Sequence, residues 1–184
     1  MNVDRSAATI STSDLEELFA ESLARLRGYF VQGAGKKWSK LYDIQRPLGA
    51  ALCQGAAMHY CDKNNGVKDF DVWFFYPFNQ THLPYRTIWN WDYQNPKFGH
   101  RAAETGYFGR RVDVLVRSIH VSPDTPPVFA VQEYLERGAS SSAKALAQKA
   151  VVMLYPESER GRVVWYRKRI LNPWSLLQKS AEFF

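Results

Sequence analysis

Hydrophobic positions repeat along the chain with two periods, and each period predicts one kind of element. Between residues 11 and 30 apolar side chains recur every three or four positions, which predicts an amphipathic helix. Short apolar runs at 47–53 and 69–76, and valines alternating with other residues at 110–121, have the pattern of strands. Gln54-Gly55 predicts a turn from the first of these strands into a short helix.

The remaining segments follow neither strand pattern. Residues 77–109 carry several prolines and glycines among many aromatic residues without a strong period, which predicts a long irregular excursion. Helical spacing and stop signals predict two further helices, one ending at Gly138 and one at Pro156. The residues up to about Ile10 have the composition of a frayed terminus, and residues 157–184 that of a basic, turn-rich tail.

Composition sets the scale of the fold. The 184 residues are 46% hydrophobic and 15% aromatic, which is enough for one well-packed core. We therefore expect a single domain over residues 1–184, with its core at about 12–155. Because helical and strand patterns are mixed along the chain, we expect an α/β (α+β) fold, with a short mixed sheet and helices packed on it.

Charge and cysteine content narrow the partners and the compartment. The formal net charge of +6 favours anionic partners such as nucleotides, and makes nucleic acid a possible partner. No apolar run reaches 18 residues and the N-terminus lacks the order of a signal peptide, so no membrane partner is expected. Cys53 and Cys61 are too few for a disulfide framework or a zinc site. Together these features predict a cytoplasmic protein.

Two aspartates interrupt the apolar strand at 69–76. Because side chains alternate along a strand, Asp69 and Asp71 share one face, where ionised carboxylates repel each other. Burying a carboxylate is costly unless it is paired or binds a metal ion. Asp113 is a third lone carboxylate, in the valine-rich strand. If the two strands are neighbours, the three carboxylates converge into an oxygen site of the kind that holds Mg²⁺ or Mn²⁺.

An alternative needs no metal ion. Asp69 could be a turn residue at the start of its strand, and Asp71 and Asp113 could each pair with an arginine at position 110 or 111. This alternative requires a separate explanation for each carboxylate, whereas a metal site explains all of them at once. We therefore favour the metal site.

The order of these motifs resembles the polymerase-beta-type nucleotidyltransferase superfamily. That superfamily has a glycine-containing turn at the start of a helix, a strand with the pattern Asp-x-Asp, and a third acidic residue on another strand. Here the turn is Gln54-Gly55-Ala56, the second motif is "DFDVWFF" and the third is "RRVDVLV". The resemblance covers residues 48–119 and implies a minimal nucleotidyltransferase-like domain.

The resemblance also implies an activity. The chain would be a Mg²⁺-dependent nucleotidyltransferase that transfers a nucleoside monophosphate from an NTP to an acceptor, which could be a small molecule, a protein or RNA. Asp69, Asp71 and Asp113 would be both the catalytic residues and the metal ligands, with Asp113 helping to activate the attacking hydroxyl. Backbone N–H groups at Gly55 and Ala56 would bind the nucleotide phosphates.

Two other functions compete with this one. The superfamily usually has Gly-Ser or Gly-Gly at the turn, so the chain could instead be a catalytically inactive member that binds nucleotide or nucleic acid. The basic run at 160–169, which includes Trp165 and Tyr166, suits single-stranded nucleic acid, although a solvated strand face gives the same pattern. A metal-dependent nuclease would need a lysine beside the carboxylates, but alternation predicts that Lys68 faces the other way.

Overall fold

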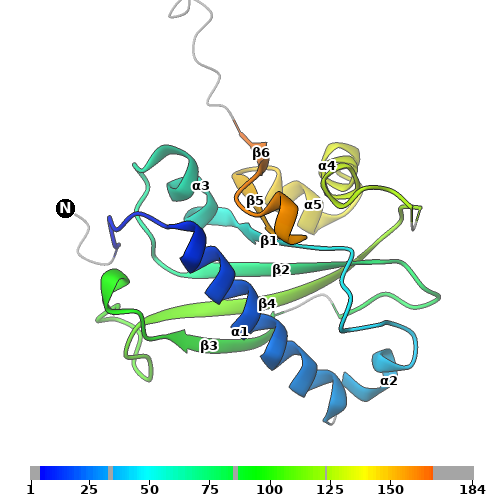
Figure 1. Cartoon of the computed structure of the whole chain (residues 1–184), viewed down its shortest axis with the longest axis horizontal. Helices are drawn as coiled ribbons and strands as arrows, with labels where there is room; N and C mark the ends of the chain where they lie inside the picture. Colours follow the sequence, from blue (N-terminus) through cyan, green and yellow to red (C-terminus); the bar gives the residue numbers. More distant parts are fainter. Residues whose placement is uncertain (1–4, 33–34, 85–86, 123, 168–184) are drawn as a thin grey trace, which may run out of the picture.

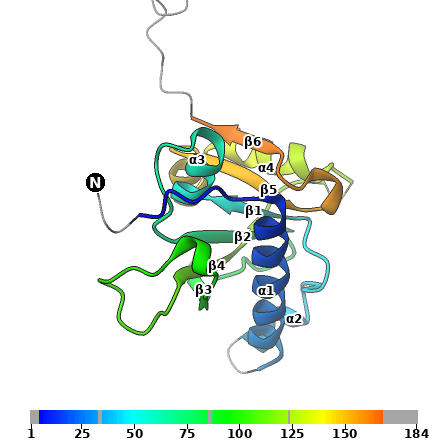
Figure 2. The same ribbon diagram turned by 60° about the vertical axis from the view of Figure 1, so that its left-hand side comes forward.

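One mixed sheet with helices on both faces organises the chain in the computed structural model, which describes residues 5–32, 35–84, 87–122 and 124–167 (Figures 1 and 2). Within these residues the sheet has six strands in the order β3-β4-β2-β1-β5-β6. β2 and β4 are parallel, and every other neighbouring pair is antiparallel. The predicted α/β (α+β) class with a short mixed sheet is therefore confirmed.

The elements are these, in chain order: α1 (Thr12–Val31), α2 (Lys36–Ser39), β1 (Gly49–Cys53), α3 (Gln54–Asp62), β2 (Phe70–Pro77), β3 (Thr87–Tyr93), η2 (Pro96–Phe98), β4 (Arg110–Ile119), α4 (Pro127–Arg137), α5 (Ser141–Leu146), β5 (Ala150–Tyr155), η3 (Glu157–Glu159) and β6 (Val163–Tyr166).

The two faces of the sheet carry two separate hydrophobic clusters. On one face, alternate residues of β1, β2 and β4, such as Phe70 and Val114, pack with the apolar stripe of α1, which crosses that face (Figure 1). On the other face, residues such as Trp73 and Phe75 pack with α4 and α5. Because β2 alternates, Asp71 lies on the same face as Trp73, the face covered by α4 and α5.

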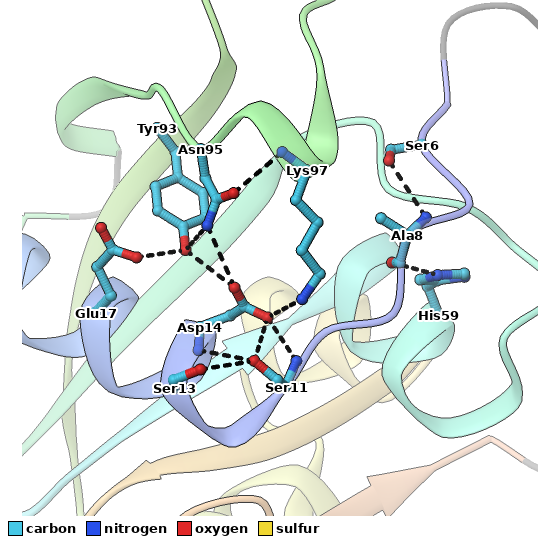
Figure 3. Close-up of polar contacts among 10 residues, drawn as sticks. All are labelled: Ser6, Ala8, Ser11, Ser13, Asp14, Glu17, His59, Tyr93, Asn95 and Lys97. Atoms are coloured by element: carbon cyan, nitrogen blue, oxygen red, sulfur yellow. Dashed lines mark hydrogen bonds and ion pairs between the residues drawn. The ribbon is translucent and has the colours of Figure 1, made fainter.

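The start of α1 is fixed by a polar network that reaches the segment after β3 (Figure 3). Ser11 caps the helix, and the Asp14 carboxylate accepts a bond of 2.6 Å from the Ser11 backbone N–H. Lys97 in η2 donates to the same carboxylate at 2.6 Å. Tyr93, at the end of β3, donates to Glu17 of α1 at 2.8 Å. The helix is thereby tied to the edge of the sheet.

Three sequence expectations about the elements were wrong. The segment before α1 is not frayed over the described residues, since Ile10 is buried and Ser6 pairs with Val67. The excursion at 77–109 contains β3, in which Trp91 and Tyr93 are buried beside α1. The predicted helix ending at Pro156 is α5 followed by β5, a strand whose positions from Ala150 to Leu154 are fully buried between two neighbours.

The predicted stop at Gly138 is confirmed, because α4 ends there with Gly138 in the left-handed conformation. The predicted basic tail is in part a strand, since β6 pairs with β5 at the edge of the sheet, and residues 168–184 lie outside the described residues. In the part of the chain that the structure describes, no helix combines the length and apolar character needed to cross a membrane.

Candidate active site at one end of the sheet

The structure brings the three predicted carboxylates to one end of the sheet. Asp71 and Asp113 are direct register partners on the parallel strands β2 and β4. Asp69 immediately precedes β2, two residues from Asp71, and thus adds a third carboxylate beside this pair. The condition set by the sequence pattern, that the two strands are neighbours, is met.

Arg111, at the start of β4, lies between two of these carboxylates. Its Nη2 atom is 3.1 Å from Oδ2 of Asp113 and 3.8 Å from Oδ2 of Asp69. Its Nη1 atom is 3.0 Å from Oε1 of Glu104. The guanidinium is therefore held by three carboxylates. The metal-free alternative describes Asp113 correctly, because Asp113 pairs with Arg111, two residues before it on the same strand.

Asp71 differs from the other two carboxylates. No hydrogen bond or ion pair joins its side chain to any residue that the structure describes. Burial, followed by the charges of Asp69 and Asp113, raises the pKa of Asp71 from 3.8 to about 7, against the opposing effect of Lys149 and Arg111. Asp71 is thus a desolvated carboxylate without a local partner, which is the condition under which a bound cation is most favourable.

The pKa of Asp113 is also raised, and here too burial is the main cause. Burial raises the pKa of Asp113, and the nearby charge and hydrogen bond of Arg111 act against that rise. The carboxylate charge at this end of the sheet is therefore only partly neutralised by the protein itself.

A pocket of about 400 Å³ opens beside Asp69 and Asp71. Its other walls come from the N-terminal segment, from the start of α3, from the loop before β2 and from the residue before β5. They include Arg5, Gln54, Gly55, Lys68 and Lys149. The sequence expectation for Lys68 was wrong: its Nζ atom lies 3.6 Å from Oδ2 of Asp69, and the residue lines the same pocket as Asp69 and Asp71. The pocket thus combines carboxylates with lysine and arginine side chains.

The glycine turn has the position that the sequence predicted, with one unexpected feature. A Cβ atom on Gly55 would meet no heavy atom within 4 Å, so the backbone here is open to a ligand. Gln54 has φ +61°, a left-handed conformation that costs energy in a residue other than glycine. The side chain of Ala56 is buried in the core, so only its backbone could serve a ligand.

Whether these residues suit a magnesium ion depends on donor chemistry and on geometry. Carboxylate oxygens are the ligands that Mg²⁺ prefers, and Asp71 has no competing partner among the described residues. Yet no group of three or more His, Cys, Asp or Glu side chains among those residues is arranged to hold a metal ion. Arg111 lies between Asp69 and Asp113. The donors fit in kind, and binding a metal ion through all three would require Arg111 to move.

His59 has a structural position. It is fully buried, its Nδ1 atom accepts the backbone N–H of Gly66 at 3.0 Å, and its Nε2 atom lies 3.1 Å from the carbonyl oxygen of Ala8. The imidazole therefore joins α3 to the loop before β2 and to the N-terminal segment, where Figure 3 shows its contact with Ala8. It does not line the pocket at Asp71.

Sequence reasoning missed three charged residues of this site. Arg111 was considered only as a structural partner, and Glu104 and Lys149 were not considered. Glu104 comes from the segment between β3 and β4, and Lys149 directly precedes β5. A correct assignment of β5 as a strand beside β1 would have placed Lys149 at the same end of the sheet as Gly55.

No family model, curated protein or solved structure matches the chain.

Proposed function

We propose that the chain is a metal-dependent nucleotidyltransferase that transfers a nucleoside monophosphate from an NTP, with Asp69, Asp71 and Asp113 as its catalytic carboxylates and Mg²⁺ or Mn²⁺ as its cofactor. The observation that carries the proposal is the position of Asp71. It lies directly beside Asp113 on the neighbouring parallel strand, and it lines a pocket together with Gly55. No hydrogen bond or ion pair joins its carboxylate to a described residue. This arrangement supports the proposal, because the acidic residues of the two motifs lie on neighbouring strands.

Each residue has a role that follows from its position. The open backbone at Gly55 admits the triphosphate, and Lys68 and Lys149 on the pocket wall neutralise its negative charge. Asp113, whose pKa is raised, accepts the proton of the attacking hydroxyl. A bound metal ion would supply charge neutralisation at the phosphoryl group.

Arg111 must give up part of its contacts for this function. Its side chain is partly exposed, so it can turn away from Asp69 and Asp113 without opening the core. We expect it then to pair with Glu104 alone. Arg111→Gln should therefore tighten Mn²⁺ binding, because the ion no longer competes with an internal cation.

The first experiment measures binding. Thermal melting of the wild type with Mn²⁺ and each NTP should show stabilisation that depends on both ligands, because a ligand that binds only the folded state stabilises it. Asp71→Asn should abolish the metal effect. Gly55→Val should abolish the NTP effect by filling the open space, while Gly28→Val serves as its matched control, because a Cβ there also meets no atom within 4 Å.

The second experiment separates an enzyme from a binding protein. The wild type with an NTP, Mn²⁺ and a mixture of acceptors should release pyrophosphate, and Asp69→Asn or Asp71→Asn should slow the release by at least about 100-fold. Asp124→Asn, at an exposed carboxylate away from the site, should have no effect. Metal-dependent NTP binding without pyrophosphate release would favour the alternative, an inactive member that binds nucleotide. If neither metal nor NTP binds, the carboxylates are structural.

A further inference from the structure

A second cavity lies at the opposite end of β4, on the same face of the sheet as Asp113. It has a volume of about 450 Å³, within the range of small-molecule sites. We call it the β4 pocket; its lining includes His82, Leu83, Arg117, Ile119, His120 and Arg137. Arg117 is four residues beyond Asp113, which places it about 13 Å away along the strand. One small ligand therefore does not fill both sites.

Arg117 is the residue that gives the β4 pocket its positive charge, since Arg137 pairs with Glu133. Arg117 is only 6% exposed, and its guanidinium carbon lies 5.8 Å from the centre of the Trp73 ring. Arg137, in the last turn of α4, adds a second guanidinium, which pairs with Glu133 and donates to the carbonyl oxygen of His120 at 3.3 Å. No Asp or Glu is present among the described residues that line the cavity. An anion is the ligand that such a lining favours, because guanidinium groups bind carboxylate and phosphate with paired N–H bonds.

The same cavity offers an apolar floor and flat ring surfaces. Leu83 and Ile119 are buried at its base. The ring of Phe78 lies 4.5 Å from that of His82 and 4.2 Å from that of His120, measured between centres. The three rings are tilted against one another rather than stacked, and those of His82 and His120 line the cavity, where a ligand ring can pack against them.

The rim is held in a defined geometry. Ser118, a buried residue of β4, accepts the backbone N–H of Leu83 at 3.2 Å, and its Oγ atom lies 3.0 Å from Nδ1 of His82. The segment that carries His82 is thus fixed to the sheet. A site whose side chains are already positioned loses less entropy when it binds a ligand.

We propose that the β4 pocket binds a small organic anion, namely a carboxylate or phosphate group attached to a ring. The anionic group lies at Arg117 and the ring packs on the apolar floor beside His82 and His120. The proposal does not rest on nucleotidyl transfer, because it requires neither the aspartates nor a metal ion.

The test uses four probes in calorimetric titrations without metal ions: benzoate, phenyl phosphate, benzamide and inorganic phosphate. Benzoate or phenyl phosphate should bind in the millimolar range, and the one that binds more tightly tells which anionic group the pocket prefers. Benzamide, which has the ring but no charge, should bind at least about tenfold more weakly than benzoate, the difference expected for one charge-assisted hydrogen bond. Inorganic phosphate should bind more weakly than phenyl phosphate, because it lacks the ring.

Two variants locate the binding. Ala139 is exposed at the rim, so Ala139→Leu narrows the cavity without disturbing the core and should weaken binding at least about tenfold, whereas Ala103→Leu, at an exposed alanine outside the cavity, should not. Arg117→Gln should remove the preference for benzoate over benzamide. If this variant does not fold, binding to Ala139→Leu and the comparison of benzoate with benzamide on the wild type still test the proposal. Equal binding of benzoate and benzamide, absence of binding by both ring anions, or unchanged binding to Ala139→Leu would each overturn the proposal.

Discussion

Replacing Asp71 by asparagine should stabilise the protein at alkaline pH and do so much less in mild acid. The folded state raises the pKa of Asp71 from 3.8 to about 7, mainly by burial and then by the charges of Asp69 and Asp113. The folded protein therefore holds this proton more tightly than the unfolded chain does. The contribution of Asp71 to stability is therefore most favourable below pH 4, falls as the pH rises from 4 to 7, and keeps the full loss above pH 7.

The size of the effect follows from this pKa. One pKa unit corresponds to about 1.4 kcal/mol, so the ionised carboxylate lowers the free energy of unfolding by about 4 kcal/mol at pH 8 and by about 1 to 2 kcal/mol at pH 5. Asparagine cannot ionise, and any difference between the amide and the protonated acid is the same at both pH values. The stability advantage of Asp71→Asn should therefore grow by about 2 to 3 kcal/mol between pH 5 and pH 8.

Urea unfolding followed by circular dichroism at pH 5 and pH 8, without divalent ions, measures this difference. Asp124→Asn is the control: it removes an exposed carboxylate, and its effect should change by less than about 0.5 kcal/mol over the same range. An advantage of Asp71→Asn that is equal at the two pH values would refute the reasoning, because it would mean that the folded state does not penalise the ionised form.

Three further changes test other parts of the structure by the same measurement. Burial alone would raise the pKa of Asp14, but its bonds to Lys97 and Ser11 lower that pKa overall. Asp14→Asn should therefore lower the free energy of unfolding by about 2 kcal/mol at pH 7 and by less below pH 4, the opposite pH trend to Asp71. An equal loss at the two pH values would contradict this prediction. His59→Ala should cost about 2 to 4 kcal/mol, since it leaves two backbone groups without partners and opens a cavity, and a variant as stable as the wild type would exclude the bracing role. Gln54→Gly should stabilise by about 0.5 kcal/mol by relieving the left-handed conformation, whereas Gln132→Gly, inside α4, should destabilise by about 1 kcal/mol; the same sign in both would be inconsistent with strain at position 54.

The elements that could be predicted from the sequence are those whose hydrophobic pattern matches the faces that they bury in the fold. α1 has one apolar stripe and one sheet face to cover, and β2 and β4 have apolar runs of strand length. β5 was predicted as a helix because serines and alanines precede it and no polar residue interrupts it. A strand that is buried on both faces has no alternation to detect, so its neighbours β1 and β6 determine it.

β3 was missed for a different reason. Trp89, Trp91 and Tyr93 alternate with polar residues, but prolines on both sides of the segment favoured an irregular loop. The buried side chains of Trp91 and Tyr93 contact α1 through hydrogen bonds to Ser22 and Glu17. Such long-range contacts outweigh local turn signals, and a single sequence does not display them.

The carboxylates of the candidate site could be predicted from the sequence, whereas its basic side chains could not. Alternation alone places Asp69 and Asp71 on one face, and the valines around Asp113 identify a charge inside a strand. The position of Arg111 between two carboxylates depends on the parallel register of β2 and β4. Register is set by pairing across the sheet, so only the folded structure shows which charges meet.

The distribution of charge at this end of the sheet argues for a function rather than for stability. A purely structural ion cluster would be expected to pair each desolvated carboxylate with a cation, and Arg111 pairs with both Asp69 and Asp113. Asp71 is more costly than either, since it is largely removed from water, is repelled by both neighbours and forms no hydrogen bond or ion pair with the residues that the structure describes. Asparagine at position 71 would keep nearly the same shape without this cost. Glycine at position 54, which lines the same pocket, would remove the strain of the left-handed conformation. The proposed function would account for both features, because a cation would offset the charge of Asp71 and a phosphate group could bind the backbone of the turn.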